Sequence, residues 1–257
     1  MSVAVVLGSA FGQEELGGRV LAPHTVSTPW GDVRLLRWPD SDAWVVMRHG
    51  IPHRHLPHQI PFRAHTAALA QVGCEALLLT SSVGVLVPNV PLFTPMLLGD
   101  LWMPDNRLPG GGPCTMWPTH HSEQGHLVWE EGPFNQALSD QIAPWLDASD
   151  QRLVFAFQAG PRTKTRAENA WFASCGAHVN SMSIGPEVVL ANELEIPVAG
   201  LVVGHKQSGT GDVPSDADWV SRSLVASKQA TERVVVRFLD EARPVPFANR
   251  IHRFHAG

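Results

Sequence analysis

The sequence predicts an α/β fold in a single domain that spans residues 1–257. Short apolar runs typical of buried strands alternate with segments of helical periodicity along the whole chain. Neither a linker nor an internal repeat interrupts this alternation. Hydrophobic residues make up 44% of the chain and charged residues 17%, which suits one extensive core and argues against a disordered protein.

The first half of the chain is predicted to contain mainly strands. Residues 3–8 form a short apolar run that ends in glycine, the pattern of a buried strand. Further strands are expected over residues 32–38, 43–50, 75–84 and 98–106. Helical spacing over residues 61–73 stops at Gly73, a residue type that commonly follows the last helical turn. Residues 107–126, rich in Pro, Gly and His, are expected to form a long excursion, which in a compact domain is usually functional or mobile.

The second half is predicted to contain most of the helices. Helical patterns cover residues 133–146, 166–176, 185–195 and 215–242. The last of these is long and amphipathic, with Ser215 or Asp216 expected as its N-cap. Strands are expected over residues 152–160, 178–182 and 196–204. The strand and helix patterns therefore alternate to the end of the chain.

Composition excludes several functional classes. The net charge of −5 and the pI near 6.2 provide no basic face for nucleic acid. Three widely spaced cysteines fit neither a disulfide framework nor a zinc site, which favours a reducing compartment. The N-terminal apolar run is too short for a signal peptide, and no apolar run is long enough to span a membrane. We therefore expect a cytoplasmic protein without membrane or nucleic-acid partners.

Small and polar residues follow most of the predicted strands. Ligands bind beyond the carboxyl ends of strands in open α/β sheets, so these termini are expected to converge on one crevice. Arg48 and His49, with the hydroxyl groups of Ser9, Ser81 and Ser183, would form a cradle for an oxyanion there. The alternative is a surface Arg-His pair with ordinary turn residues around it.

Histidines also cluster in the sequence, but they do not indicate a metal site. His49, His53, His55 and His58 lie close together without a cysteine or carboxylate among them to complete a ligand set. Neither an HExxH motif nor paired CxxC motifs occur. We therefore expect no metal and no cofactor, and polar loop histidines or ligand contacts instead.

Taken in order, the strand ends resemble those of the trimeric purine nucleoside phosphorylase and 5′-methylthioadenosine phosphorylase family. The segments that carry the resemblance are GSAFG (8–12), MRHGIPHRHLP (47–57), FRAHTAAL (62–69), LLLTSSVG (77–84), GDLWMPDN (99–106), AGPRTKTRAE (159–168) and GAHVNSMSIGPEVVLANE (176–193). The resemblance extends from Val3 to about Ala242, and the last segment is the most specific. It implies a mixed, barrel-like sheet surrounded by helices, and a homotrimer, with a hexamer as the alternative.

The resemblance also implies an activity and a set of site residues. The activity is that of a pentosyltransferase: inorganic phosphate, a co-substrate rather than a cofactor, cleaves a purine nucleoside to free base and ribose 1-phosphate. The implied phosphate site comprises Ser9, Arg48, His49, Ser81, Ser183 and the backbone of Ser82. His53 and Met182 would flank the ribose. His126 would reach the 5′ pocket of a neighbouring subunit.

The positions that would contact the base depart from the family. Where relatives carry Glu or Ser this chain has Lys164, preceded by Thr163, and where they carry Asn or Asp it has Lys206, with His205 as the alternative after a one-residue shift. These are two of only three lysines in the chain. Lysine donates hydrogen bonds and accepts none, so this pair favours an acceptor-rich or anionic base such as a dioxopurine. A cation at Lys206 or His205 would also donate to N7 of the departing base.

Two other interpretations stay open at this stage. The lysines would carry no such meaning if both side chains turned outward or if selection on the base site had been lost. The expected function is phosphorolysis of a purine nucleoside with an oxopurine-type preference. The alternatives are a non-catalytic paralogue that binds a nucleotide or other anion, a 5′-methylthioadenosine-type phosphorylase and, less favoured, a hydrolytic nucleosidase.

Overall fold

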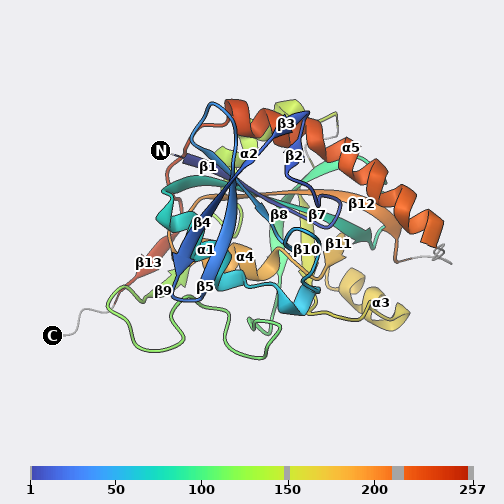
Figure 1. Ribbon diagram of the computed structural model, residues 1–257. Helices are drawn as coiled ribbons and strands as arrows, with labels where there is room; N and C mark the ends of the chain where they lie inside the picture. Colours follow the sequence, from blue (N-terminus) through green and yellow to red (C-terminus); the bar gives the residue numbers. More distant parts are fainter. Residues whose placement is uncertain (1, 148–150, 210–216, 254–257) are drawn as a thin grey trace.

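Nine strands form one mixed sheet that closes on itself at one end (Figure 1). The computed structural model describes residues 2–147, 151–209 and 217–253. In the order in which they lie across the sheet, the strands are β11 (Val179–Ser181), β10 (Leu153–Phe157), β8 (Pro95–Trp102), β12 (Val198–Gln207), β7 (Cys74–Val85), β1 (Ser2–Leu7), β6 (Ala43–Met47), β5 (Gly31–Arg37) and β4 (Ala22–Thr28).

The closed part of the sheet explains its barrel-like shape. Strand β11 pairs in parallel with β10 and antiparallel with β7, so β7, β12, β8, β10 and β11 form a ring of five strands. The parallel pairings of β1 with β7 and β6 extend β7 into the open part of the sheet. Strand β7 therefore belongs both to the barrel and to the open sheet. The predicted α/β fold with a mixed, barrel-like sheet is confirmed.

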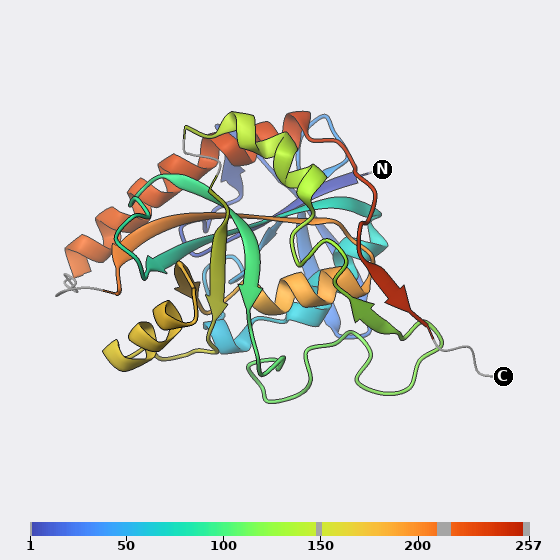
Figure 2. The ribbon, with the colours of Figure 1, turned by 180° about the vertical axis from the view of Figure 1, so that it is seen from behind.

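Helices cover both faces of the sheet (Figures 1 and 2). Helices α2 (Gln136–Ile142) and α5 (Ala217–Glu241) lie on one face, and α1 (Phe62–Gln71) and α4 (Gly185–Glu193) on the other. Helix α3 (Arg166–Ser174) lies at the barrel end, and η1 (Pro57–Gln59) and η2 (Ala143–Trp145) are 3-10 turns. Short two-stranded sheets pair β2 (Glu15–Leu16) with β3 (Arg19–Val20) and β9 (His126–Val128) with β13 (Arg250–His252).

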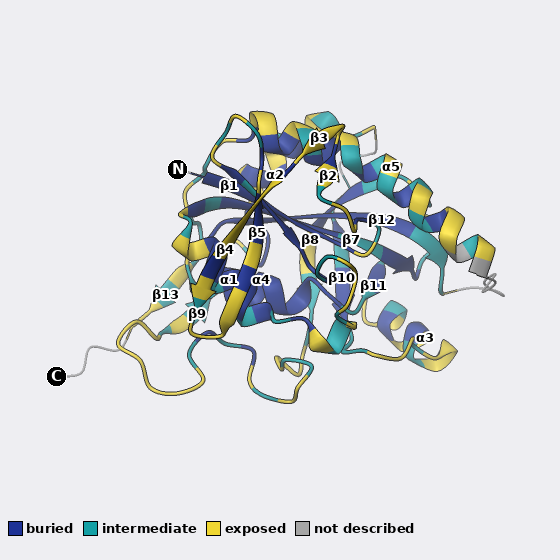
Figure 3. Ribbon diagram, viewed as in Figure 1, coloured by how far each residue is buried: buried dark blue, intermediate teal, exposed yellow. Residues whose placement is uncertain are grey.

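The core follows from the alternation of side chains along the central strands. Ala4 and Val6 of β1 belong to the apolar cluster on the α1 and α4 side, whereas Val5 and Leu7 belong to the cluster under α5. Figure 3 shows these strands buried while the outer side of α5 is exposed. Burial on both faces gives the continuous apolar runs that the sequence shows at these strands.

Most predicted elements are present, with shifted ends. Helix α1 ends before Gly73, whose φ of +70° is the left-handed conformation expected there. The strand predicted over 98–106 occupies residues 95–102. The strand predicted to end at residue 204 continues to Gln207, so that it includes His205 and Lys206. The predicted N-cap of α5, Ser215 or Asp216, lies outside the described residues.

Five strands were not predicted, and two of them, β2 and β3, are only two residues long. Strand β4 is an edge strand that exposes most of its side chains and contains Pro23, so its apolar pattern is weak. Strands β9 and β13 are three residues long, which is too short for a periodic pattern. Within the described ranges, no helix combines the length and apolar character that a membrane crossing requires.

Candidate active site

Arg48 lies at the end of β6 and is fully buried. Its Nε donates to Glu187 of α4 at 2.8 Å and 3.1 Å, and its Nη1 donates to the carbonyl oxygen of Thr80 at 2.6 Å. No partner for Nη2 occurs among the described residues. A buried guanidinium nitrogen without an acceptor is energetically unfavourable, so Nη2 is available for an anionic ligand.

Glycine at position 8 allows Arg48 to approach the end of β1. A Cβ atom on Gly8 would lie 3.2 Å from Arg48 Nη1 and 3.3 Å from the carbonyl oxygen of Thr80. The backbone N–H of Gly8 donates to Thr80 Oγ1 at 3.3 Å, which connects β1 with β7 at the same point. The glycine that ends the first predicted strand therefore makes room for the arginine.

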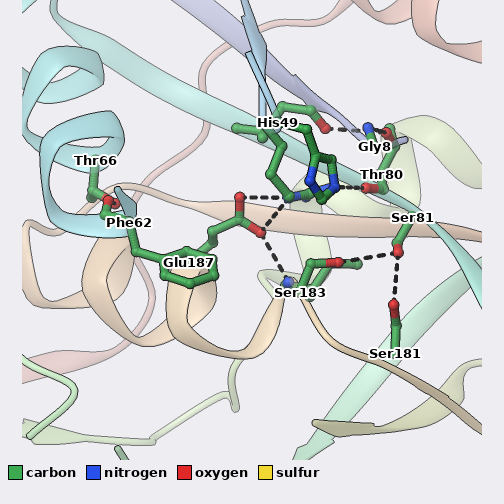
Figure 4. Close-up of polar contacts among 12 residues, drawn as sticks. Gly8, His49, Phe62, Thr66, Thr80, Ser81, Ser181, Ser183 and Glu187 are labelled. Carbon is green, nitrogen blue, oxygen red and sulfur yellow. Dashed lines mark hydrogen bonds and ion pairs between the residues drawn. The ribbon is translucent and has the colours of Figure 1, made fainter. Parts of the chain in front are cut away.

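Three serine hydroxyls lie together in the candidate site, those of Ser81, Ser181 and Ser183 (Figure 4). Ser81 Oγ on β7 lies 3.2 Å from Ser183 Oγ and 3.3 Å from Ser181 Oγ. Ser181 ends β11, and Ser183 precedes α4. Hydroxyls of this kind rotate to donate to an oxyanion. Ser181 was not predicted, although it lies two residues before Ser183 in the segment most similar to the phosphorylases.

Glu187 connects the arginine with the serine segment. Both carboxylate oxygens accept from Arg48 Nε, and Oε2 also accepts from the backbone N–H of Ile184 at 2.9 Å. Ile184 has φ +67°, which is strained for a β-branched residue and persists only where its surroundings hold it. Glu187 thus fixes the backbone next to Ser183 as well as the guanidinium.

His49 lies beside Arg48, and its ring stacks on His53 with centroids 4.4 Å apart. Nδ1 of His49 lies 2.8 Å from the carbonyl oxygen of His55, to which it donates. Burial, and then the positive charge of Arg48, lower the pKa of His49 to about 4. The imidazole is therefore neutral near pH 7 and presents Nε2 as an acceptor.

A cavity of about 120 Å³ opens next to the serines, and it is lined by Ser82, Gly84, Thr163, Lys164, Asn169, Asn180, Ser181, Met182, His205, Lys206 and Ser208. The four residues predicted at the base position, Thr163, Lys164, His205 and Lys206, are in this lining. Met182, predicted to flank the ribose, is there too, whereas His53, predicted beside it, is not. Both lysines line the cavity, which favours the interpretation in which they face a ligand.

Both His205 and Lys206 reach the cavity because β12 is irregular at this point. The register against β7 shifts between Gly204 and Lys206, which places His205 at the bulge. The two residues predicted as alternatives for one position therefore line the cavity together. Burial and the neighbouring Lys206 lower the pKa of His205 to about 4, so the proposed imidazolium donor at this position is not supported. A neutral His205 still has one N–H to donate.

Lys164 lies between β10 and α3, one residue before the helix cap. Burial, and then repulsion from Lys206, lower the pKa of Lys164 to about 8. Thr165 Oγ1 accepts from the backbone N–H of Glu168 at 3.2 Å, and Glu168 accepts from the N–H of Thr165 at 2.7 Å. This capping box fixes the start of α3 and with it the position of Lys164.

Two predicted residues lie apart from the rest. Ser9 is exposed in the turn after β1, and among the described residues it has no hydrogen bond to Arg48 or to the serine group. His126 is on β9 and lines a different cavity of about 500 Å³, together with Trp129 and Glu193. One chain therefore does not bring His126 to the candidate site.

Several site residues were missed by sequence reasoning. Glu187, Thr80, Asn169, Asn180 and Ser208 support or line the site without carrying an obvious motif. Glu187 was visible in the PEV segment, but nothing in the sequence shows that it pairs with Arg48. Among the described residues, no group of three or more His, Cys, Asp or Glu side chains is placed to hold a metal ion.

Comparison with known proteins identifies the family. An S-methyl-5′-thioadenosine phosphorylase of Fusarium vanettenii is 30% identical over 208 residues, which cover 76% of this chain and 64% of that protein. A probable S-methyl-5′-thioinosine phosphorylase of Pseudomonas syringae pv. tomato is 28% identical over 213 residues, covering 79% of this chain and 84% of the relative. The chain thus spans slightly less than two thirds of the first relative and most of the second.

A solved structure shows the same fold. The methylthioadenosine phosphorylase of Schistosoma mansoni in complex with adenine has a TM-score of 0.77 and 22% identity, over 93% of this chain and 90% of that one. The family model described as the phosphorylase superfamily matches residues 13–240, which is most of the sequence. In agreement with the resemblance inferred from its strand ends, the chain belongs to the phosphorylase superfamily, a family of nucleoside phosphorylases.

Proposed function

We propose that this protein catalyses the phosphorolysis of a purine nucleoside, with inorganic phosphate bound by Arg48, His49, Ser81 and Ser183. The observation that carries the proposal is the unpartnered Nη2 of the buried Arg48 beside a cluster of hydroxyl groups. Neutral His49 offers Nε2 as an acceptor to the hydroxyl of a hydrogen phosphate ion. The cavity next to the cradle then receives the base.

The reaction transfers the pentose from the base to phosphate. A phosphate oxygen forms a bond to C1′ while the bond between C1′ and the base nitrogen breaks, and its electron pair leaves with the base. The base takes up a proton as it departs. Phosphate beneath C1′ stabilises the oxocarbenium-like transition state through its charge and its proximity.

The named relatives favour a 5′-methylthio nucleoside as the substrate. Relatives include S-methyl-5′-thioadenosine and probable S-methyl-5′-thioinosine phosphorylases, which supports the methylthioadenosine-type alternative over a preference for oxopurine ribonucleosides. The oxopurine preference rests on Lys164 and Lys206 alone. Methylthioinosine carries a 6-oxopurine, so both features can be combined in one substrate.

A substrate panel with and without phosphate tests the proposal. We expect phosphate-dependent base release from at least one of 5′-methylthioadenosine, 5′-methylthioinosine, inosine, guanosine, xanthosine and adenosine. The pentose product should be the 1-phosphate. Base release that ignores phosphate would instead indicate a nucleosidase. No turnover of any of these nucleosides, by protein shown to be folded, would contradict the proposal.

A second candidate function is binding of an anion without catalysis. The observation that favours it is the pair of lysines, Lys164 and Lys206, in the lining of the base cavity. Calorimetry with nucleotides and sugar phosphates distinguishes the two functions. Tight binding of these anions together with no turnover would support the second candidate.

A further inference from the structure

Among the described residues that line the base cavity there are two lysines and no carboxylate. Lys164 enters it from the loop before α3, and Lys206 enters it from β12. The remaining described lining residues are hydroxyl, amide, thioether, imidazole or glycine residues. Two like charges in one small cavity repel each other, and a site of this kind is stabilised by an anion placed between them.

Glu168, the carboxylate nearest to Lys164 in sequence, already has hydrogen-bond partners. Both oxygens of Glu168 accept from Arg162, at 2.7 Å and 2.8 Å, and one also accepts from the backbone N–H of Thr165. Among the described residues, neither Lys164 nor Lys206 has a carboxylate within salt-bridge distance. The charge of the two lysines is therefore not neutralised by Glu168.

The amide groups in the cavity are engaged as well. Asn180 Nδ2 donates to Asn169 Oδ1 at 2.9 Å, and Asn169 Nδ2 donates to the carbonyl oxygen of Ser208 at 3.0 Å. These side chains support one another across β11, α3 and the end of β12. The strongest donors left to face a ligand are thus the ammonium groups of Lys164 and Lys206.

We propose that the base is bound as an anion between Lys164 and Lys206, so that the preferred nucleoside carries a dioxopurine of the xanthine type. This inference rests on the proposed phosphorolysis and names the class of base. Xanthine nucleosides lose a ring proton in the mildly acidic range, so the base is an anion near neutral pH. Its oxo groups and ionised ring nitrogen are acceptors that match two donors.

The same arrangement disfavours adenine. Its exocyclic amino group is a hydrogen-bond donor. Opposite an ammonium group, which is also a donor, neither group would have an acceptor. Sites built for one hydrogen-bonding pattern reject the opposite pattern by factors of about 10⁴ or more. Hypoxanthine, a neutral acceptor at its oxo group, is expected to lie between the two bases.

An ionised base also needs the lysines for its departure. The leaving base keeps the electron pair of the broken bond, so an anionic base approaches a second negative charge in the transition state. Two ammonium groups in a partly desolvated cavity stabilise that charge where water does so only weakly. The lysines thus act on the rate of cleavage as well as on binding.

Proton uptake gives a readout that is separate from turnover. The groups facing Lys164 are Lys206 and His205 from β12 and, more weakly, Glu168 from α3. Burial, and then repulsion from Lys206, lower the pKa of Lys164 to about 8, so an anion between the lysines should raise this pKa again. Xanthosine binding at pH 8 should therefore take up a fraction of a proton, whereas adenosine should not. Calorimetry in buffers of different ionisation enthalpy measures this.

The decisive experiment compares nucleosides that differ only in the base. We expect kcat/KM for xanthosine to exceed that for adenosine by about 100-fold or more, with inosine between them. Lys206→Met and Lys164→Met should each reduce this ratio by at least about 10-fold. Lys228→Met is the matched control, because it removes the third lysine of the chain, which lies over Phe11 in the described structure, and leaves the cavity intact.

The panel separates failure of this inference from failure of the proposed function. Phosphorolysis that prefers adenosine or 5′-methylthioadenosine to the oxopurine nucleosides would overturn the anionic-base assignment while the enzyme class stands. The 5′-methylthio pair, methylthioinosine and methylthioadenosine, repeats the test with the other sugar. An equal loss of the xanthosine-to-adenosine ratio in the control variant Lys228→Met would also overturn it.

The absence of phosphorolysis with every nucleoside would reject the proposed function. Binding of xanthosine without proton uptake would contradict only the assignment of the base as an anion.

Discussion

The guanidinium of Arg48 has two partners within the protein and one nitrogen without any in the described structure. This division matters because each nitrogen has a fixed direction in the planar group. Nε donates to Glu187 and Nη1 to Thr80, whereas both N–H groups of Nη2 are left for a ligand among the described residues. A lysine at this position offers one compact ammonium group and cannot reproduce all three directions.

Substituting Arg48→Lys should therefore weaken phosphate binding without removing the positive charge beside Glu187. We expect the KM for phosphate to rise by about 10- to 100-fold, equivalent to roughly 1.4 to 2.8 kcal/mol, with a smaller effect on the KM for the nucleoside. Initial rates over a phosphate titration measure this, with circular dichroism as the control for folding. An unchanged phosphate KM would show that the anion lies elsewhere.

Buried neutral histidines make the protein sensitive to acid. The pKa values of His49 and His205 are about 4, and that of the fully buried His65 is about 3, in each case mainly through burial. Because these values are below the 6.5 of an unfolded histidine, the unfolded chain binds more protons. The stability is fully present above pH 6.5 and is lost as the pH falls towards 4.

We expect His205→Gln to flatten this dependence. Between pH 6.5 and 4.5 the variant should lose about 1 to 2 kcal/mol less of its unfolding free energy than the parent protein. Urea unfolding at several pH values measures the difference. His24→Gln, at an exposed position of β4, is the control and should leave the parent slope unchanged. A parallel decline in the parent and His205→Gln would contradict the assignment of His205 as a buried neutral group.

At the scale of elements, Glu187 holds the start of α4 against the ends of β6 and β11. The ion pair with Arg48 is buried on both sides, with 0% and 3% of the side chains exposed. Its strength is therefore little screened by solvent, and removal of one partner leaves a buried charge. The same carboxylate also supports the positive φ of Ile184.

Glu187→Gln should destabilise the protein by about 3 kcal/mol, because the charge of Arg48 loses its buried counter-charge while the amide still accepts from Ile184. Phosphate should restore more stability to this variant than to the parent, since the anion becomes the main partner of the guanidinium. Thermal unfolding with and without phosphate measures both effects. A phosphate-induced shift no larger than that of the parent would argue against phosphate binding at Arg48.

The sequence predicted most elements and part of the cavity lining, but not the contacts that organise them. Order and burial of β1, β7 and β12 follow from local apolar runs, and the positions of Lys164 and Lys206 follow from a resemblance over many segments. The pairing of Glu187 with Arg48 joins residues 139 positions apart, and no local pattern encodes it. The bulge at His205 likewise depends on the register against β7, which a single strand does not reveal.

At the scale of the whole molecule, the position of His126 is not explained by the candidate site of its own chain. It pairs with His252 across β9 and β13 and lies at a cavity other than the candidate site. The resemblance implies that this segment serves a neighbouring subunit in a homotrimer. The separation of His126 from Arg48 within one chain is compatible with that arrangement.

Subunit mixing tests the homotrimer. We expect sedimentation to give three times the mass of the chain, and His126→Ala and Arg48→Lys to be impaired separately. When the two variants are unfolded together and refolded, mixed trimers should contain some sites with both residues intact, so part of the activity should return. Activity that stays at the average of the two variants would show that His126 acts within its own chain or not at all.

Strand β7 connects the candidate phosphate cradle with the base cavity. Ser81, in the candidate phosphate cradle, and Ser82, in the lining of the base cavity, are consecutive residues of this strand, so their Cα atoms are separated by about 3.8 Å whatever surrounds them. The two lysines proposed to bind the base come instead from the loop before α3 and from β12. Substitutions at Lys164 or Lys206 therefore leave the strand that joins the candidate phosphate cradle to the base cavity unchanged.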